Sequence, residues 1–323
     1  MENNQRYQQM CDYFPGELGR LLHKLPYFIR SDLHEIRVRA NRPISLMTAK
    51  QCWFLQKDGQ PVKQPSSNCW IFSTRQIETL FKSFCEYSVH SFQNEIVNGY
   101  ITIVGGHRIG ICGTVLTEAG KVIGIREISS LNIRIAREVR GAADEIFSRV
   151  LGGKLQSILI AGVPASGKTT LIREIARGIS DGRLGRFYKV AMIDERGELA
   201  AIYQGAPQNE IGISTDVYHL CPKAIGMELA LRTGAPDIIF CDEIGQSDDA
   251  NMLIRSMLAG VKVIATAHAD SISTLMKREQ IQYLCKQQIF DKIVLLKQED
   301  TPCEIDKIVQ VEQLFHTREK VTS

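Results

Sequence analysis

The 323-residue sequence lacks three features that would place it in other classes of protein. No apolar run approaches the roughly 20 residues that span a bilayer, so any membrane association would be peripheral or through a partner. The formal net charge of +3 is too small to indicate nucleic acid as a partner. The polar opening Met1-Glu-Asn-Asn-Gln does not resemble a targeting segment. We therefore expect a cytoplasmic location.

The nine cysteines lack the spacing of a metal site or of a disulfide framework. No two of them stand as Cys-x-x-Cys, and they are scattered along the whole chain. An odd, scattered set in a chain of this length is typical of reduced thiols in the core. The length also favours two domains over one, because a single core rarely grows this large.

Residues 1–140 are expected to form a smaller α+β domain. The alternating run Glu35-Ile-Arg-Val-Arg39 predicts a half-buried strand, and Ser73 precedes apolar positions at helical spacing. Two alternating runs flank Gly105-Gly106, which predicts a β-hairpin. A charged segment leading to Gly152-Gly153 indicates a linker over residues 141–154.

Residues 155–323 are expected to form an α/β domain in which apolar strands alternate with helical segments. This rhythm predicts a parallel sheet with helices on both faces, whose chemistry gathers at the carboxyl ends of the strands. Two apolar segments near the C-terminus, 292–296 and 307–311, predict a terminal hairpin. The four strands expected to carry the chemistry are 158–161, 190–193, 238–240 and 261–266.

The run Gly162-Val-Pro-Ala-Ser-Gly-Lys-Thr169 satisfies the pattern G-x-x-x-x-G-K-[ST] between an expected strand and an expected helix. Backbone N–H groups and the helix N-terminus would hold phosphate in such a loop. Lys168 would reach the β- and γ-phosphates, and the Thr169 hydroxyl would bind Mg²⁺. The sequence therefore predicts a site for a nucleoside triphosphate with Mg²⁺, and the family resemblance given below implies that the nucleotide is ATP. The expected nucleotide contacts are Gly162, Val163, Pro164, Ala165, Ser166, Gly167, Lys168, Thr169 and Thr170.

Acidic residues and one histidine follow the other expected strands. Asp242 would hold Mg²⁺ through water, and Glu243 would act as general base towards the attacking water. Asp194 and Glu195 repeat the pattern on the preceding strand, where ordinary solvated acids are an alternative interpretation. His268 ends the fourth strand and is a candidate sensor of the γ-phosphate, although a lone histidine is more often structural.

These four elements, in this order, resemble the secretion-type ATPase superfamily of type II and type IV secretion and pilus machines. The resemblance implies a RecA-like P-loop ATPase domain, with a Walker A loop, an acidic box at 194–198, a Walker B pair and a histidine box at His268. The acidic box reads Asp-Glu-Arg-Gly-Glu, which departs from the commoner form. Which of its acids is catalytic therefore stays open.

A narrower resemblance, to the stage III sporulation protein AA family, covers about residues 17 to 290. It implies a motor ATPase on the mother-cell side of a channel complex between mother cell and forespore, working as a homo-oligomeric ring, a hexamer in its relatives, with membrane channel proteins as partners. In secretion ATPases, arginines of the N-terminal domain reach phosphates at a domain or subunit boundary. Arg108 and Arg134 match those positions, although a solvated arginine on a polar strand face is the alternative. The segments that carry this resemblance are 35–43, 105–113, 128–138 and 193–199 together with Cys241-Asp-Glu-Ile-Gly245.

Two other functions remain as alternatives. A RecA-like nucleic-acid-binding ATPase is not excluded, because Arg20, Lys24, Arg30, Arg37 and Arg39 make the N-terminal region basic. No dense Lys/Arg stripe with interleaved aromatic residues accompanies them, as single-strand binders usually need. A kinase or a nucleotide-gated scaffold is the third alternative, and the sequence has no distinct lid segment for a kinase.

Overall fold

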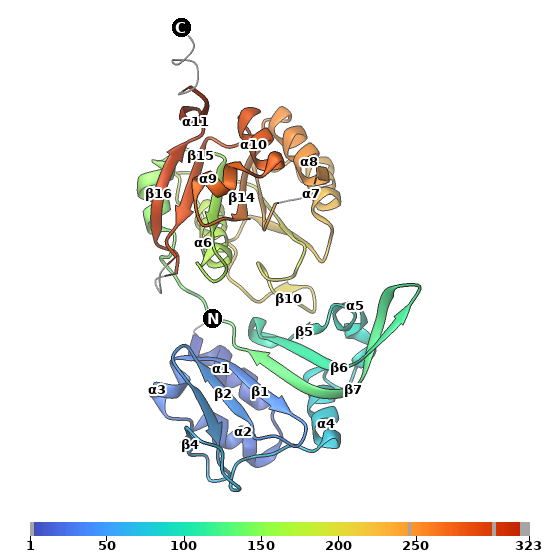
Figure 1. The fold of residues 1–323 in the computed structure, drawn as a ribbon. Helices are drawn as coiled ribbons and strands as arrows, with labels where there is room; N and C mark the ends of the chain where they lie inside the picture. The colour runs from blue at the N-terminus through green and yellow to red at the C-terminus, as the bar shows by residue number, and fades with distance from the viewer. Residues whose placement is uncertain (1–2, 245–246, 299–301, 317–323) are drawn as a thin grey trace. The chain divides into compact units, whose positions relative to one another are not determined.

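Two seven-stranded sheets organise the chain, one in each of two compact units (Figure 1). The computed structural model describes residues 3–244, 247–298 and 302–316. Unit 1 comprises the chain up to Glu138 together with Ala201–Gln208, and unit 2 comprises Val139–Ala200 and the chain from Asn209 onwards. Each unit has its own buried core.

Unit 1 is an antiparallel sheet with helices packed on its apolar face. Its helices are α1 (Asn3–Asp12), α2 (Gly16–His23), α3 (Tyr27–Arg30), α4 (Thr74–Phe84), α5 (Gln93–Ile96) and the 3₁₀ turns η1 (Val89–Phe92) and η2 (Val104–Gly106). Its strands are β1 (Leu33–Arg39), β2 (Ser45–Thr48), β3 (Cys52–Leu55), β4 (Pro61–Val62), β5 (Tyr100–Thr102), β6 (Arg108–Glu118), β7 (Lys121–Arg134), β10 (Ile202–Tyr203) and β11 (Ala206–Pro207). The sheet order is β4-β3-β2-β1-β7-β6-β5.

The alternation expected at residues 35–39 builds the middle of this sheet. Ile36 and Val38 of β1 are fully buried, whereas Glu35 and Arg37, which alternate with them, point to the other face. The predicted capping residue Ser73 accepts from the Gln76 amide, and the Gln76 side chain accepts from the Ser73 amide. This reciprocal capping box fixes the start of α4. The predicted hairpin around Gly105-Gly106 is confirmed as the antiparallel pair β5–β6.

A short hairpin returns from the sequence of unit 2 and belongs to the core of unit 1. Tyr203 on β10 is 8% exposed, donates its hydroxyl to Glu86 and stacks on Phe92. Gln208 accepts from the Gly105 amide at 2.9 Å through its side chain. Residues 201–208 therefore pack in unit 1, although they lie within the range that the sequence assigns to the second domain.

Unit 2 is a mostly parallel sheet. Its helices are α6 (Lys168–Ser180), α7 (Lys223–Thr233), α8 (Ser247–Leu258), α9 (Ile272–Met276), α10 (Glu279–Lys286), α11 (Gln313–His316) and the π-helical η3 (Ile146–Leu151). Its strands are β8 (Ile158–Gly162), β9 (Val190–Asp194), β12 (Thr215–His219), β13 (Ile238–Cys241), β14 (Lys262–His268), β15 (Lys292–Leu296) and β16 (Ile305–Gln310).

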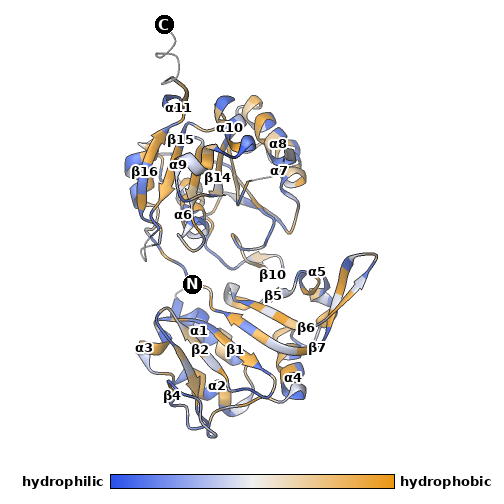
Figure 2. Cartoon of the chain, viewed as in Figure 1, coloured by the Kyte–Doolittle hydropathy of each residue, from blue (hydrophilic) through white to orange (hydrophobic). Residues whose placement is uncertain are grey.

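The sheet order β12-β9-β13-β14-β8-β15-β16 confirms the α/β fold class. All neighbouring strands pair in parallel except β15 and β16, which form the predicted terminal hairpin. Helices α7, α8 and α10 share one buried cluster with the sheet, while α6 packs on the opposite face against β8, β9 and β14. Figure 2 shows hydrophobic residues along the central strands, as burial on both faces requires.

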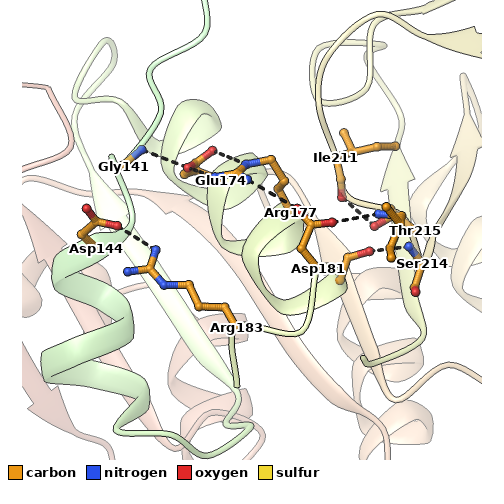
Figure 3. A network of polar contacts seen from close by, with 11 residues as sticks. Gly141, Asp144, Glu174, Arg177, Asp181, Arg183, Ile211, Ser214 and Thr215 are labelled. Carbon is orange, nitrogen blue, oxygen red and sulfur yellow. Dashed lines mark hydrogen bonds and ion pairs between the residues drawn. The ribbon is translucent and has the colours of Figure 1, made fainter. Parts of the chain in front are cut away.

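The linker expected at 141–154 folds instead as part of unit 2. The apolar side chains of Ile146, Phe147 and Val150 in η3 are buried within unit 2. Figure 3 shows the polar contacts around this segment: Gly141 donates to Glu174 at 3.0 Å, and Arg183 pairs with Asp144 at 2.7 Å. The segment thereby holds α6, whose first residue is Lys168.

Other contacts in Figure 3 hold the far end of α6. Glu174 pairs with Arg177, which also pairs with Asp181 at 3.4 Å. Asp181 in turn accepts from the Ile213 amide, and the Ser180 hydroxyl accepts from the Ser214 amide just before β12.

In the part of the chain that the structure describes, no helix is long and apolar enough to cross a membrane.

A buried histidine makes the stability of unit 1 depend on pH. His107 is fully buried; its Nδ1 accepts from the Ala136 amide, so its Nε2–H donates to the Arg6 carbonyl at 2.9 Å. Burial lowers the pKa of His107 from 6.5 to about 4, because the charged form cannot be hydrated there. The unfolded chain then binds the extra proton, so stability is lost as the pH falls from 6.5 towards 4.

We expect the free energy of unfolding to lose about 3 kcal/mol from this group between pH 7 and pH 4. In urea titrations at several pH values, His107→Gln should be less stable than wild type at pH 7 but should show a shallower loss on acidification. His34→Gln, at an exposed histidine, is the control and should keep the wild-type slope. Equal slopes for wild type and His107→Gln would contradict this assignment.

Candidate phosphate-binding site of unit 2

The parallel register of the unit 2 sheet brings the predicted site residues to one edge. His268 at the end of β14 is paired with Gly162 at the end of β8, and Cys241 at the end of β13 is paired with Ile193 of β9. The glycine-rich loop, the two acidic turns and His268 therefore follow neighbouring strands at their carboxyl ends. Ligands of open α/β sheets bind at this edge.

The loop between β8 and α6 has the backbone of a phosphate cradle. Gly167 precedes the helix with φ 89°, and Ala165 has φ 64°, a left-handed conformation that is uncommon for a residue with a side chain. Lys168, 7% exposed, donates from Nζ to the carbonyls of Gly162 and Val163 at 2.8 Å each. Burial lowers the pKa of Lys168, while the carboxylates of Asp242 and Glu243 raise it. The ammonium is thus held inside the loop, close to both acids.

The loop is tightly wound and carries a buried polar atom that a ligand could satisfy. Ser166 is 4% exposed, and its Oγ has no hydrogen-bond partner within the described residues. A Cβ on Gly162 would lie 2.4 Å from this Oγ, so a side chain there would displace the Ser166 hydroxyl. Buried hydroxyls are normally paired, so an unpaired one in a cradle of N–H groups fits an incoming phosphate or a metal-bound water. The Thr169 hydroxyl and the Asp242 carboxylate both offer oxygen atoms, the type of ligand that Mg²⁺ prefers.

The segment that joins the two strands of the C-terminal hairpin contacts the glycine-rich loop. The sequence did not indicate this contact. Between β15 and β16, the Cys303 amide donates to the Ser166 carbonyl at 2.9 Å, and its Sγ lies 3.5 Å from the Gly167 carbonyl. A Cβ on Gly167 would lie 2.6 Å from that Sγ. Gly167 is therefore required both by its positive φ and by the packing of Cys303.

The acidic pair after β13 is fixed from the neighbouring strand. The Thr266 hydroxyl on β14 donates to Asp242, and the same oxygen accepts from the Glu243 amide at 2.8 Å. Glu243 has φ 40°, so the chain turns sharply there. Thr266 is fully buried and was not among the predicted site residues, because a threonine in a buried β-strand has no distinctive sequence signal.

Glu243 lies between two further candidate residues. Its Oε2 is 2.8 Å from Arg196 Nη1, and its Oε1 is 3.2 Å from His268 Nε2. The other ring nitrogen of His268, Nδ1, is buried with no hydrogen-bond partner among the described residues. The structure thus brings His268 and Glu243 together, as their strand ends predict.

Asp194 and Glu195 have different surroundings, which bears on which acid of this box acts. Asp194 is 1% exposed, and its carboxylate accepts from the backbone amides of Glu198, Leu199 and Ala200 at 2.8, 3.1 and 2.9 Å. This carboxylate therefore shapes the turn that follows β9. Glu195 is partly exposed and pairs with the buried Lys223 at the start of α7, a residue that sequence reasoning missed.

Arg108 and Arg134 both lie in unit 1, directly opposite each other on adjacent strands. The register of β6 and β7 pairs Arg108 with Arg134, and that of β1 and β7 pairs Arg134 with Glu35. Arg134 is 72% exposed and lies 3.5 Å from Glu35, while the Arg108 guanidinium stacks on the Tyr100 ring at 3.5 Å from its centroid. Each arginine has an acidic neighbour within unit 1, Glu35 for Arg134 and Glu95 for Arg108.

Comparison with solved structures defines the class of fold. The ATPase DotB of Yersinia pseudotuberculosis matches with a TM-score of 0.60 at 16% identity, covering 95% of this chain and 84% of DotB. The pilus retraction motor PilT, solved with bound ADP, matches with a TM-score of 0.51 at 18% identity, covering 81% of this chain and 74% of PilT. The chain therefore shares the RecA-like fold of these two ATPases.

Comparison of sequences defines the family. The profile of the family described as "Sporulation stage III, protein AA" matches residues 4–313. Stage III sporulation protein AA of Bacillus subtilis (strain 168) is 34% identical over 301 residues, which cover 93% of this chain and 94% of that relative. This chain belongs to the sporulation stage III protein AA family.

The three bonds to Asp194 predict its contribution to stability. Asp194→Asn would turn one acceptor oxygen into a donor that faces a backbone amide, so we expect a loss of about 1–3 kcal/mol in the free energy of unfolding. Urea denaturation of the full chain measures this loss. Asp216→Asn, at an exposed acid on neighbouring β12, is the control and should change stability by less than about 0.5 kcal/mol. A neutral Asp194→Asn would contradict the structural role.

Proposed function

We propose that this protein is a motor ATPase that binds ATP with Mg²⁺ and hydrolyses it at the phosphate-binding edge of unit 2. One observation carries the proposal: Lys168 lies inside a glycine-rich loop close to Asp242 and Glu243, and Glu243 contacts His268. Loop, lysine and acid pair together form the arrangement that P-loop enzymes use for phosphoryl transfer. The secretion-ATPase fold supports the same conclusion.

In this proposal the loop amides and Lys168 hold the phosphates, with the positive end of α6 beneath them. Lys168 exchanges its two loop carbonyls for phosphate oxygens when nucleotide binds. Thr169 and Asp242 would hold Mg²⁺, which neutralises charge on the phosphates when it is bound. The nucleotide-contact residues are those of the run 162–170.

Glu243 is the residue that we assign as general base. Its carboxylate follows β13 and interacts electrostatically with Lys168 of the loop. The Asp194 carboxylate instead shapes the turn after β9 through three backbone amides, and Glu195 pairs with Lys223 at the start of α7. Glu243 would accept a proton from the water that attacks the γ-phosphorus. His268 and Arg196 contact this carboxylate and lie where either could sense the γ-phosphate.

We further propose that the protein works as a homo-oligomeric ring, a hexamer by resemblance to secretion ATPases, that energises a membrane channel complex during sporulation. Membership of the sporulation stage III protein AA family supports the setting. In such a ring Arg108 and Arg134 would supply positive charge to a phosphate across a subunit boundary. Arginines in this role can raise the rate by about 10³-fold or more.

The chemistry is tested by ATP turnover of the purified full chain. We expect Lys168→Ala to abolish nucleotide binding and turnover. Glu243→Gln should keep ATP binding but lower kcat by about 10²–10⁴-fold, the usual contribution of a positioned general base. Glu195→Gln is the matched comparison and should retain most activity. ATP binding without turnover in wild type would favour the scaffold alternative.

The arginine assignment is tested by the dependence of turnover on protein concentration. Turnover per subunit should rise with concentration as rings assemble, and Arg108→Ala should lower it by about 10-fold or more at every concentration. Arg126→Ala, on the same β7 strand as Arg134, is the control and should retain wild-type turnover. Activity independent of concentration and unaffected by Arg108→Ala would contradict this assignment.

A further inference from the structure

Thr266 is a polar residue two positions before the end of a buried strand, where the sheet alone would favour an aliphatic side chain. It lies on β14, between β13 and β8, and is fully buried among residues such as Ile264 and Ala265. A buried hydroxyl costs stability unless it is hydrogen-bonded, and valine would fill the same volume without that cost. The partners of this hydroxyl therefore indicate why threonine stands here.

Thr266 makes hydrogen bonds with three consecutive residues of the acidic turn. Its hydroxyl donates to Asp242 and accepts from the Glu243 amide at 2.8 Å, and its carbonyl accepts from the Ile244 amide at 2.9 Å. The β13–β14 ladder ends at the pair Cys241 and Ala265. Thr266, the next residue of β14, thus holds the turn that follows β13.

These bonds fix the orientation of both acids. Glu243 has φ 40°, a conformation that costs about 1 kcal/mol or more for a residue with a side chain and persists only where the surroundings hold it. The Thr266 hydroxyl holds the amide of Glu243 in this turn and fixes one oxygen of Asp242. Two residues further along the same strand face, His268 contacts the Glu243 carboxylate at 3.2 Å. Both ends of Glu243 are therefore held by β14.

We propose that Thr266 is a positioning residue that sets the orientation of the Asp242 and Glu243 carboxylates towards the bound nucleotide. The proposal rests on the proposed ATPase function. Thr266 contacts neither substrate nor metal in this role; it acts through the two acids. Its loss would change the rate of the chemical step and the response to Mg²⁺ more than the affinity of the loop for phosphate.

Thr266→Ser and Thr266→Ala form a matched pair, because both lose the methyl group and only serine keeps the hydroxyl. In the full chain we expect Thr266→Ala to lower kcat about 10-fold or more, since a misplaced catalytic group can cost up to about 10²-fold. Its half-saturating Mg²⁺ concentration should rise several-fold, while the affinity for ATP changes less than about threefold. Thr266→Ser should stay close to wild type in all three measurements.

Ser157→Ala is the control for a purely structural effect on β14. The buried Ser157 hydroxyl accepts from the Val263 amide at 3.1 Å, at the opposite end of the same strand. This variant should lower the melting temperature but leave kcat and the Mg²⁺ response unchanged. Thr266→Val, of the same volume as threonine, should resemble Thr266→Ala if it folds; the serine and alanine pair decides the question if it does not.

The outcomes separate this inference from the proposed function. If wild type shows Lys168-dependent turnover and the serine and alanine variants behave alike, the positioning role of Thr266 is overturned while the ATPase function stands. If wild type shows no turnover, the ATPase function fails, and Thr266 is tested by hydrogen exchange at the Glu243 amide. That exchange should be about 10-fold faster in Thr266→Ala than in Thr266→Ser, and equal rates would overturn the inference.

Discussion

The in-register parallel pairing of β9, β13, β14 and β8 is the constraint on which the site depends. Because the four strands run parallel, the groups that follow them meet at one edge of the sheet, although β13 ends opposite Ala265 of β14 and β8 ends opposite His268. The buried strands need apolar residues on both faces, so the polar residues of the site stand at the strand ends or, like Thr266, within two residues of one. A shift of one register position would move His268 away from Gly162 and turn Thr266 to the other face.

Buried polar groups hold the turns at this edge in shape. The Asp194 carboxylate closes the turn after β9 with three backbone amides, and the Thr266 hydroxyl closes the turn after β13. Cys303 does the same for the glycine-rich loop through its own amide. The acids at the strand ends therefore fall into two groups. The Asp194 carboxylate binds backbone amides and fixes a turn. The Glu243 carboxylate contacts the side chains of Arg196 and His268.

The sequence predicted the parts of the fold and site that depend on local pattern. The glycine-rich loop, the apolar strands and the terminal hairpin were evident because spacing and hydrophobicity specify them within a few residues. Strand β12 was missed because it is a half-exposed edge strand with no strong apolar run. Cys303, Thr266 and Lys223 were missed because their partners lie 137, 24 and 28 residues away, and nothing local marks such contacts. The charged composition of residues 141–154 suggested a linker. The segment instead packs in unit 2 because its few apolar residues are buried there.

The hairpin of residues 201–208 makes the chain pass between the two units three times, after Glu138, Ala200 and Gln208. Cutting the chain at the first passage would not separate two self-sufficient fragments, because the second would carry Tyr203 and Gln208 without Glu86 and Gly105. The exit and return points already pair, with the Asn209 amide donating to the Ala200 carbonyl at 3.1 Å. A dissection of this protein would therefore excise the hairpin and join these two residues through a tight turn.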